Sequence, residues 1–138
     1  MRFIIDTNVI VAAVRSPKGA SAEILRRALL GQIKLLCSVP LFLEYEAVLK
    51  RPEYLQAAGI SLGDASNLLD ALAGAIEAVE IAYLWRPQLR DPADDMVLEA
   101  AVNGQASTII TFNQRDFLPQ ALAVGLTVVK PAQFFEGA

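Results

Sequence analysis

The chain has 138 residues, 54% of them hydrophobic, and is therefore long and apolar enough for a single domain, 1–138, with a continuous core. It has no histidine and a single cysteine, Cys37. This excludes an internal disulfide, a zinc site of histidine and cysteine, and catalysis by Ser-His-Asp or Cys-His groups. Twelve Lys and Arg against 15 Asp and Glu give a net charge of −3, which argues mildly against a nucleic-acid partner.

Short apolar runs alternate with stretches of helical periodicity along the sequence. In chain order, the predicted elements are a strand at 2–6, a helix after the Asp-Thr-Asn turn, a helix within 21–32, a strand at 34–38, a helix from 40 to about 50, an amphipathic helix at 62–78, a strand at 79–83, a helix at 92–104, strands at 107–112 and 126–130, and a helical turn at 131–135. This alternation predicts an α/β domain with a mostly parallel sheet, whose apolar strands are covered on both faces.

The sequence shows no sign of a membrane segment. No apolar run reaches the roughly 18 residues that a membrane-spanning helix needs. Asp6 and Asn8 interrupt the first apolar stretch, which therefore lacks the long hydrophobic segment of a signal peptide. We expect a cytoplasmic protein with no membrane partner.

Acid or amide side chains follow the ends of four successive predicted strands. Asp6 ends the first strand, and Glu44 lies about one turn into the helix after the second. The Asp-rich segment 91–95 opens the helix after the third strand, and Asn113 and Asp116 follow the fourth. In open α/β sheets, functional groups gather beyond the carboxyl ends of the strands. These side chains are therefore predicted to meet at one edge of the sheet.

Each of these residues also has a purely structural interpretation. Asp6 can cap the helix that follows, although the neighbouring Thr and Asn can do so in its place. Glu44 and Glu46 lie on opposite margins of the apolar stripe of their helix, so either can be a solvated surface charge. Asn113 and Asp116 can be turn-forming residues.

The segment DPADD contains both capping residues and a spare acid. Asp91 suits the N-cap, Pro92 suits the first helical position, and Asp94 can complete an arrangement like a capping box. Asp95 has no capping role and shares a helix face with Leu98. Asp95 is therefore favoured as the functional acid, with Asp94 as the second choice.

Four motifs, DTNVIVAAV, LEYEAVL, DPADDMVLEAA and TFNQRDF, resemble those of the PIN-domain family, and they occur in order between Arg2 and about Phe134. In particular, the chain resembles the toxin-component subgroup related to the VapC-type ribonucleases. The resemblance implies a three-layer α/β/α sandwich with a central parallel sheet of four to five strands. It also implies a metal-dependent endoribonuclease that hydrolyses RNA phosphodiester bonds.

The family's site residues can be carried over position by position. Its acids fall on Asp6, Glu44, Asp95 and Asp116, with Asp94 as an alternative to its neighbour, and its polar positions fall on Thr111 and Asn113, with Asn8 beside the first acid. The polar residues are expected to orient water or phosphate. Such a set of oxygen ligands suits Mg²⁺ or Mn²⁺ and disfavours zinc.

Several carboxylates held together repel one another, so the site is expected to prefer a cation. We expect Asp6 and Asp95 to bind this metal ion directly, and Glu44 and Asp116 to complete its ligand set or to hold its waters. A metal ion at this position would acidify the water that attacks the phosphodiester and would offset the charge that develops on the phosphate oxygens.

A nuclease site also needs local positive charge, which the acidic composition does not supply in bulk. Five cationic residues lie in loops near the predicted site and are expected to line it, together with Asn8, as RNA-binding residues: Arg15, Lys18, Arg86, Arg90 and Arg115.

Two other functions stay open, and partners are implied as well. A haloacid-dehalogenase-type phosphatase also has Asp at the end of its first strand, but it needs a second Asp two residues later, where this chain has Asn8. A non-catalytic PIN-like module that binds RNA or protein would agree with the negative net charge. The resemblance further implies a cognate antitoxin protein and a homodimer, for which the helix at 62–78 is a candidate contact surface.

Overall fold

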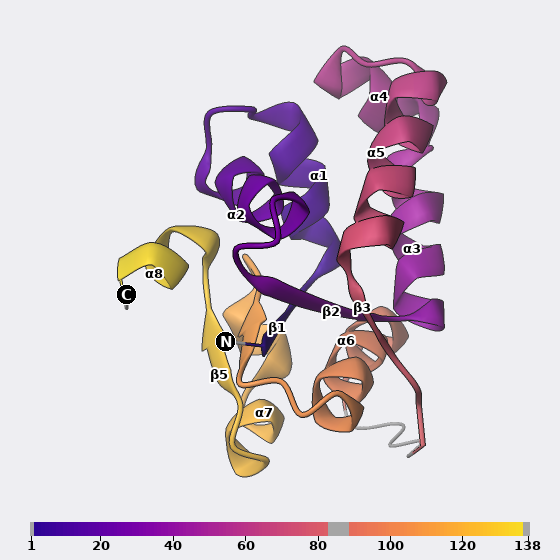
Figure 1. Ribbon diagram of the computed structural model, residues 1–138. Helices are drawn as coiled ribbons and strands as arrows, with labels where there is room; N and C mark the ends of the chain where they lie inside the picture. The colour runs from indigo at the N-terminus through magenta and orange to yellow at the C-terminus, as the bar shows by residue number, and fades with distance from the viewer. Residues whose placement is uncertain (1, 83–88, 137–138) are drawn as a thin grey trace.

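Within residues 2–82 and 89–136, which the computed structural model describes, five short strands form one parallel sheet in the order β3-β2-β1-β4-β5 (Figure 1). The strands are β1 (Arg2–Ile5), β2 (Lys34–Ser38), β3 (Glu77–Val79), β4 (Thr108–Ile110) and β5 (Thr127–Val129). The helices are α1 (Thr7–Arg15), α2 (Ala20–Leu29), α3 (Val39–Leu49), α4 (Pro52–Ala58), α5 (Leu62–Ala75), α6 (Pro92–Asn103), the 3₁₀ turn η1 (Gln114–Phe117), α7 (Gln120–Ala123) and α8 (Pro131–Glu136).

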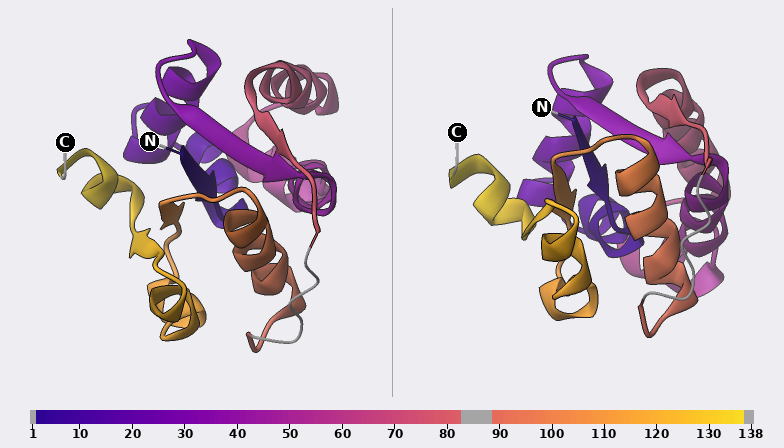
Figure 2. Two further views of the ribbon diagram at one scale, coloured as in Figure 1. Left: turned by 60° about the horizontal axis from the view of Figure 1, so that its bottom comes forward. Right: turned by 90° about the horizontal axis from the view of Figure 1, so that it is seen from below.

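Helices cover both faces of the sheet. Figures 1 and 2 show α1, α2 and α5 on one side of the strands, and α6 and α7 on the other. Strand β1 pairs with β2 on one side and with β4 on the other, so the strand order reverses beside β1. In sheets of this kind, functional sites form beyond the carboxyl ends of the strands at such a switch point.

The apolar sequence of β1 explains its central position. Phe3, Ile4 and Ile5 have no exposed surface, because helices cover the sheet on both sides. Phe3 pairs in register with Leu35 of β2 and with Thr108 of β4. This buried strand fixes the position of the residue that follows it, which is Asp6.

The predicted α/β class and the parallel sheet are confirmed, but several boundaries differ. The strand expected at 79–83 is instead Glu77–Val79, and α5 ends at Ala75, because Ile76 takes an extended conformation although it continues the apolar stripe. Residue 83 lies outside the described residues. Helix α4 was not predicted, and it buries none of its residues, so the sequence there has no apolar periodicity. Helix α7 was also not predicted and has only four residues.

Among the described residues, no helix combines the length and the apolar composition needed to cross a bilayer.

Gly104, which follows α6, is expected to tolerate no side chain. A Cβ atom at this position would lie 2.7 Å from Cγ2 of Val79 and 3.1 Å from Cδ1 of Leu36. Gly104→Ala should therefore overpack this region and lower the free energy of unfolding by about 1–3 kcal/mol, as measured by urea denaturation. Gly74→Ala is the matched control, because nothing lies within 4 Å of that Cβ, and in helix α5 it should leave stability unchanged or raise it by up to ~1 kcal/mol. Equal effects of the two changes would contradict this prediction.

Candidate active site

Asp6 lies at the switch point, directly after β1, and both of its carboxylate oxygens are held. Oδ1 accepts a hydrogen bond of 2.8 Å from the backbone N–H of Thr7, which makes Asp6 the N-cap of α1. Oδ2 accepts a hydrogen bond of 2.8 Å from the hydroxyl of Thr111, at the end of the neighbouring strand β4. The side chain is only 8% exposed. Asp6 therefore caps α1 and also lies at the candidate site, so its role as a cap does not exclude a role in function.

Thr111 links this carboxylate to the segment after β4. Its hydroxyl is completely buried, donates to Asp6, and accepts a hydrogen bond of 3.0 Å from the backbone N–H of Asn113. Both residues lie where the sequence motif TFNQRDF predicted polar groups. The hydroxyl thus fixes the distance between the first and fourth strand ends, while the Asn113 side chain is exposed at the surface.

The two adjacent acids at the start of α6 have different surroundings. Asp91 caps the helix, because its Oδ1 accepts a hydrogen bond of 2.9 Å from the N–H of Ala93. Asp95 is 3% exposed and its Oδ1 accepts a hydrogen bond of 3.0 Å from the N–H of Leu89, inside the protein. Asp94 is 9% exposed and lines a surface cleft together with Asp6. The sequence favoured Asp95, whereas the geometry favours Asp94 as the acid that faces the cleft.

This acidic cleft has a volume of about 250 Å³ and gathers residues from five segments of the chain. Its lining consists of Asp6, Thr7, Asn8, Val11, Glu44, Val48, Arg51, Tyr54, Asp91, Ala93, Asp94, Asn113 and Asp116. Five carboxylates thus share one hollow. Glu44 lines it, whereas the neighbouring Glu46 forms an ion pair with Lys50, 3.7 Å from Nζ to Oε2.

The carboxylates repel one another in their charged forms. Burial raises the pKa of Asp94 to about 7, and the charges of Asp6, Asp91, Asp116 and Asp95 add to this effect in that order. Burial also raises the pKa of Asp6, although the hydrogen bonds from Thr111 and Thr7 act in the opposite direction. Protonation of these carboxyl groups would relieve the repulsion, and a nearby positive charge would have the same effect.

The donor atoms around the cleft fit a hard divalent cation. All are oxygens of carboxylates, amides or hydroxyls, which are the ligands that Mg²⁺ and Mn²⁺ prefer. Oδ1 of Asn8 is buried and has no hydrogen-bond partner among the described residues. Within the described part of the chain, no group of three or more acidic or cysteine side chains is arranged so that it could hold a metal ion by itself. A site of this kind suits Mg²⁺, which retains several waters and binds through one or two carboxylates together with a phosphate.

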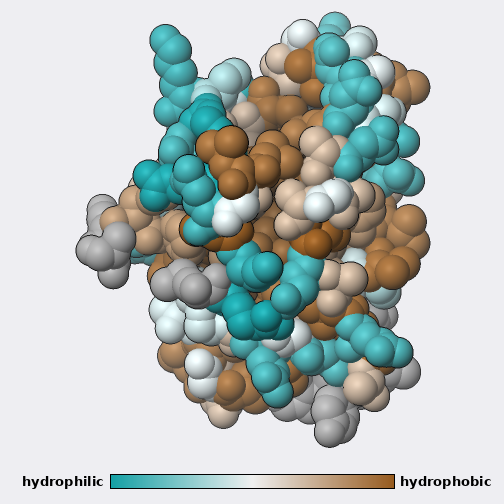
Figure 3. Space-filling model, viewed as in Figure 1, coloured by the Kyte–Doolittle hydropathy of each residue, from teal (hydrophilic) through white to brown (hydrophobic). Residues whose placement is uncertain are grey.

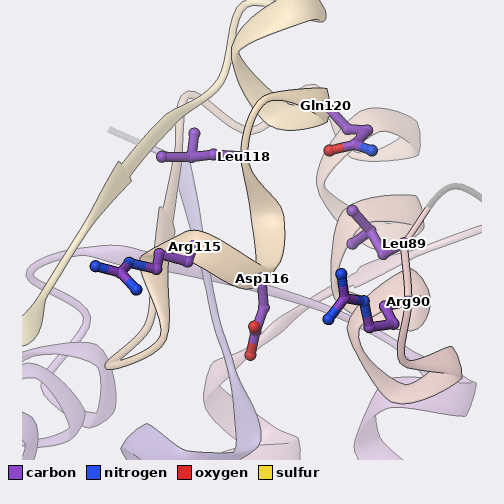
Figure 4. A pocket seen from close by; sticks show the side chains of 6 residues that line it. All are labelled: Leu89, Arg90, Arg115, Asp116, Leu118 and Gln120. Atoms are coloured by element: carbon purple, nitrogen blue, oxygen red, sulfur yellow. The ribbon is translucent and has the colours of Figure 1, made fainter.

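A second hollow, with a volume of about 450 Å³, adjoins the first and carries positive charge. This arginine pocket is lined by Leu89, Arg90, Arg115, Asp116, Leu118 and Gln120. Figure 4 shows Arg115 of η1 and Arg90 of the loop before α6 on either side of the Asp116 carboxylate. Because Asp116 lines both hollows, the acidic cleft and the arginine pocket meet at this residue.

The arginines that lack ion pairs are concentrated around these hollows. Among the described residues, Arg2, Arg26 and Arg27 form ion pairs with Glu77 or Glu23, and no ion pair is formed by Arg15, Arg51, Arg90 or Arg115. Arg15 lies over the ring of Tyr54, which lines the cleft. Lys18 is exposed and lines neither hollow, and Arg86 lies outside the described residues. Positive charge is thus available beside the acids, although the chain as a whole is negatively charged.

Sequence reasoning did not identify three charged or aromatic residues of the cleft as site residues, namely Arg51, Tyr54 and Asp91. Asp91 was assigned to capping alone, and it serves as a cap while also lining the cleft. The other two belong to the segment RPEY, in which Arg51 is the N-cap residue of α4 and Tyr54 lies in its first turn. A basic residue and an aromatic residue so close to the helix of Glu44 were the available signal.

Comparison with known proteins gives a match to one family. The sequence model of the PIN domain matches residues 2–115, a range that includes Asp6, Glu44 and Asp94. No curated protein matches the chain in sequence.

Proposed function

The chain belongs to the PIN-domain family, whose members are generally nucleases, and from this premise we propose that it is a metal-dependent endoribonuclease. The observation that carries the proposal is the convergence of Asp6, Asp94 and Asp116 on one cleft, from three segments far apart in the sequence. The arginine pocket beside the cleft supports a polyanionic substrate, because unpaired guanidinium groups bind phosphate oxygens.

We propose Asp6 and Asp94 as the principal metal ligands, in place of the pair Asp6 and Asp95. Asp6 is held in a fixed orientation by Thr7 and Thr111, and Asp94 faces it across the cleft. Glu44 and Asp116 would complete the set, because both line the same hollow. When bound, a Mg²⁺ or Mn²⁺ ion supplies a positive charge that acidifies the attacking water and offsets charge on the phosphate.

The other residues of the site would position the RNA. Asn113 can donate from its exposed amide group to a phosphate oxygen at the cleft, while Thr111 keeps Asp6 in place. Arg90 and Arg115 would hold the neighbouring phosphate in the arginine pocket. With the neighbouring phosphate bound in this pocket, the phosphodiester at the cleft is fixed in relation to the acids, and this positioning is a large part of phosphoryl-transfer catalysis.

The role as the toxin of a toxin–antitoxin pair, the antitoxin partner, the homodimer and the cytoplasmic location are proposals that rest on the resemblance described above. A shallow apolar groove between α1, α2 and α5 supports a protein partner, and Figure 3 shows apolar side chains on this face. Its lining includes Ala13, Val14, Leu25, Leu29 and Leu68. Light scattering at micromolar concentration tests the dimer, and a monomeric mass would contradict it.

Two alternatives make different predictions about chemistry. A non-catalytic PIN-like module would bind RNA or protein without cleaving RNA in any divalent cation. A haloacid-dehalogenase-type phosphatase would form a covalent phosphate on Asp6, although Asn8 stands where its second Asp is required. The cleft of this chain contains five acids and adjoins an arginine pocket, an arrangement that favours the nuclease over both alternatives.

The direct test compares the wild type with Asp6→Asn on end-labelled, unstructured RNA in Mg²⁺, in Mn²⁺ and in EDTA. We expect cleavage only with the cation, and a loss of roughly 10²- to 10³-fold in the variant. Asp70→Asn, which makes the same change at an exposed position on α5, should cleave as the wild type does. Tight RNA binding without cleavage would favour the binding module. Equal cleavage by wild type and Asp6→Asn would contradict the assigned site.

A further inference from the structure

Tyr54 places an aromatic ring in the wall of the acidic cleft. It belongs to the first turn of α4, which begins at Pro52, and its side chain is half-buried. The ring lines the same hollow as Asp6 and Asp94. Aromatic residues in the core of this protein pack against apolar neighbours, as Phe3 does against Phe134, whereas Tyr54 lies among carboxylates and guanidinium groups.

Two arginines lie over this ring, and neither is packed tightly against it. The Cζ atoms of Arg15 and Arg51 are 6.0 Å and 5.9 Å from the ring centroid. Between α2 and α8, by comparison, Cζ of Arg27 lies 4.6 Å from the ring centroid of Phe135, and Arg27 forms an ion pair with Glu23. Arg15 and Arg51 form no ion pair within the described residues and are exposed. Small rotations of these two side chains would open a face of the ring.

We propose that Tyr54 is a nucleobase-stacking residue, on which an unpaired base of the RNA rests while Arg15 and Arg51 contact the adjoining phosphates. The inference rests on the proposed function, because it names a subsite of the same cleft. A base and an aromatic ring stack with little dependence on sequence, and guanidinium groups add cation–π and phosphate contacts. Three side chains from α1, the α3–α4 junction and α4 thus provide both kinds of contact.

This subsite complements the arginine pocket. The acidic cleft is lined by Tyr54 and also by Asp116, and Asp116 in turn lines the pocket of Arg90 and Arg115. A strand that passes across the acids can therefore contact the protein through a base at Tyr54 and through a phosphate at the pocket. The base must leave any duplex to stack, which requires the strand to be unpaired at this nucleotide.

The test measures binding of a fluorescent single-stranded 12-nucleotide RNA in EDTA, where cation-dependent cleavage does not occur. Tyr54→Leu should weaken binding by about 5- to 100-fold, whereas Tyr54→Phe should stay within about twofold of the wild type because the ring is retained. Phe135→Leu, which removes the other arginine–aromatic pair, is the matched control and should bind as the wild type does. Melting temperatures of all variants are compared to exclude loss of folding.

A second probe separates stacking from a structural role of the tyrosine. RNAs with one abasic nucleotide at each successive position should reveal a position where the wild type loses affinity and Tyr54→Leu does not. Equal losses for both proteins at every position, or a Tyr54→Phe variant as weak as Tyr54→Leu, would overturn the inference. Such results would leave the nuclease proposal intact if Mg²⁺-dependent cleavage persists. Absence of cleavage together with a Tyr54-dependent abasic position would overturn the nuclease alone, and absence of any RNA binding would overturn both.

Discussion

Asp94→Asn should abolish most RNA cleavage and, at the same time, make the metal-free protein more stable. The activity is expected to fall by roughly 10²- to 10³-fold, because a carboxylate facing the cation is replaced by a neutral amide. Stability in EDTA at pH 8 is expected to rise by roughly 1–3 kcal/mol, because the variant no longer holds a charged, buried carboxylate beside four others. Cleavage assays and urea unfolding of the same preparations measure both quantities.

Asp95→Asn is the matched control for this experiment, because it changes the adjacent residue in the same way. Its side-chain oxygen can still accept the hydrogen bond from the N–H of Leu89, so most of the activity should remain. An Asp95→Asn variant as inactive as Asp94→Asn would instead support Asp95 as the functional acid. Loss of activity in Asp94→Asn with lowered stability would indicate a structural role for the Asp94 carboxylate.

Without divalent cations, the protein should lose stability as the pH rises from 5 to 8. The pKa of Asp94 is raised to about 7 in the folded protein from an ordinary value of 3.8, and the pKa of Asp6 is raised as well. A carboxyl whose folded pKa is raised favours folding while it is protonated, and this contribution is lost as the pH rises through the folded pKa. The melting temperature in EDTA should therefore fall across this window.

Saturating Mn²⁺ should restore the melting temperature at pH 8 and have little effect at pH 5, where protons compete for the same oxygens. The chain has no histidine, so few other groups titrate between these pH values, and the effect can be assigned to the cleft. The pKa values of Glu23 and Asp64 are lowered, so their contributions change only at lower pH. A flat profile, or one with the same slope in Asp94→Asn, would contradict this account.

The sheet could be predicted because strands that are covered on both faces have short, continuous apolar sequences, and these alternate with stretches of helical periodicity. Residues 2–6 and 34–38 show this clearly, and each contains a strand of the sheet. The third strand was misplaced because Ile76 continues the apolar stripe of α5, and apolarity does not reveal whether a residue continues a helix or begins a strand. Helix α4 was missed because a helix that buries nothing has no apolar periodicity.

For the candidate site, the sequence could predict which segments meet at the edge of the sheet, but not which of their side chains point into the cleft. Parallel strands deliver their carboxyl ends to one edge, and the acidic cleft does contain Asp6, Glu44, Asn113 and Asp116. The orientation of α6 was not predictable in the same way, because adjacent residues of a helix differ by about 100°. The face that Asp95 shares with Leu98 was interpreted as functional, whereas in the structure the Asp95 carboxylate accepts a buried hydrogen bond from Leu89 and Asp94 lines the cleft.

The position of β1 also bears on when during synthesis the site can exist. Asp6 is synthesised more than a hundred residues before its partner Thr111 and the strand β4 that aligns them. Pairing between such distant segments is late and slow to form, because the intervening chain must first be closed into a loop. An unfinished chain has the first acid but lacks Asp94, Asp116 and the arginine pocket. The acidic cleft can therefore form only after the segment that carries Thr111 and Asp116 has left the ribosome and folded.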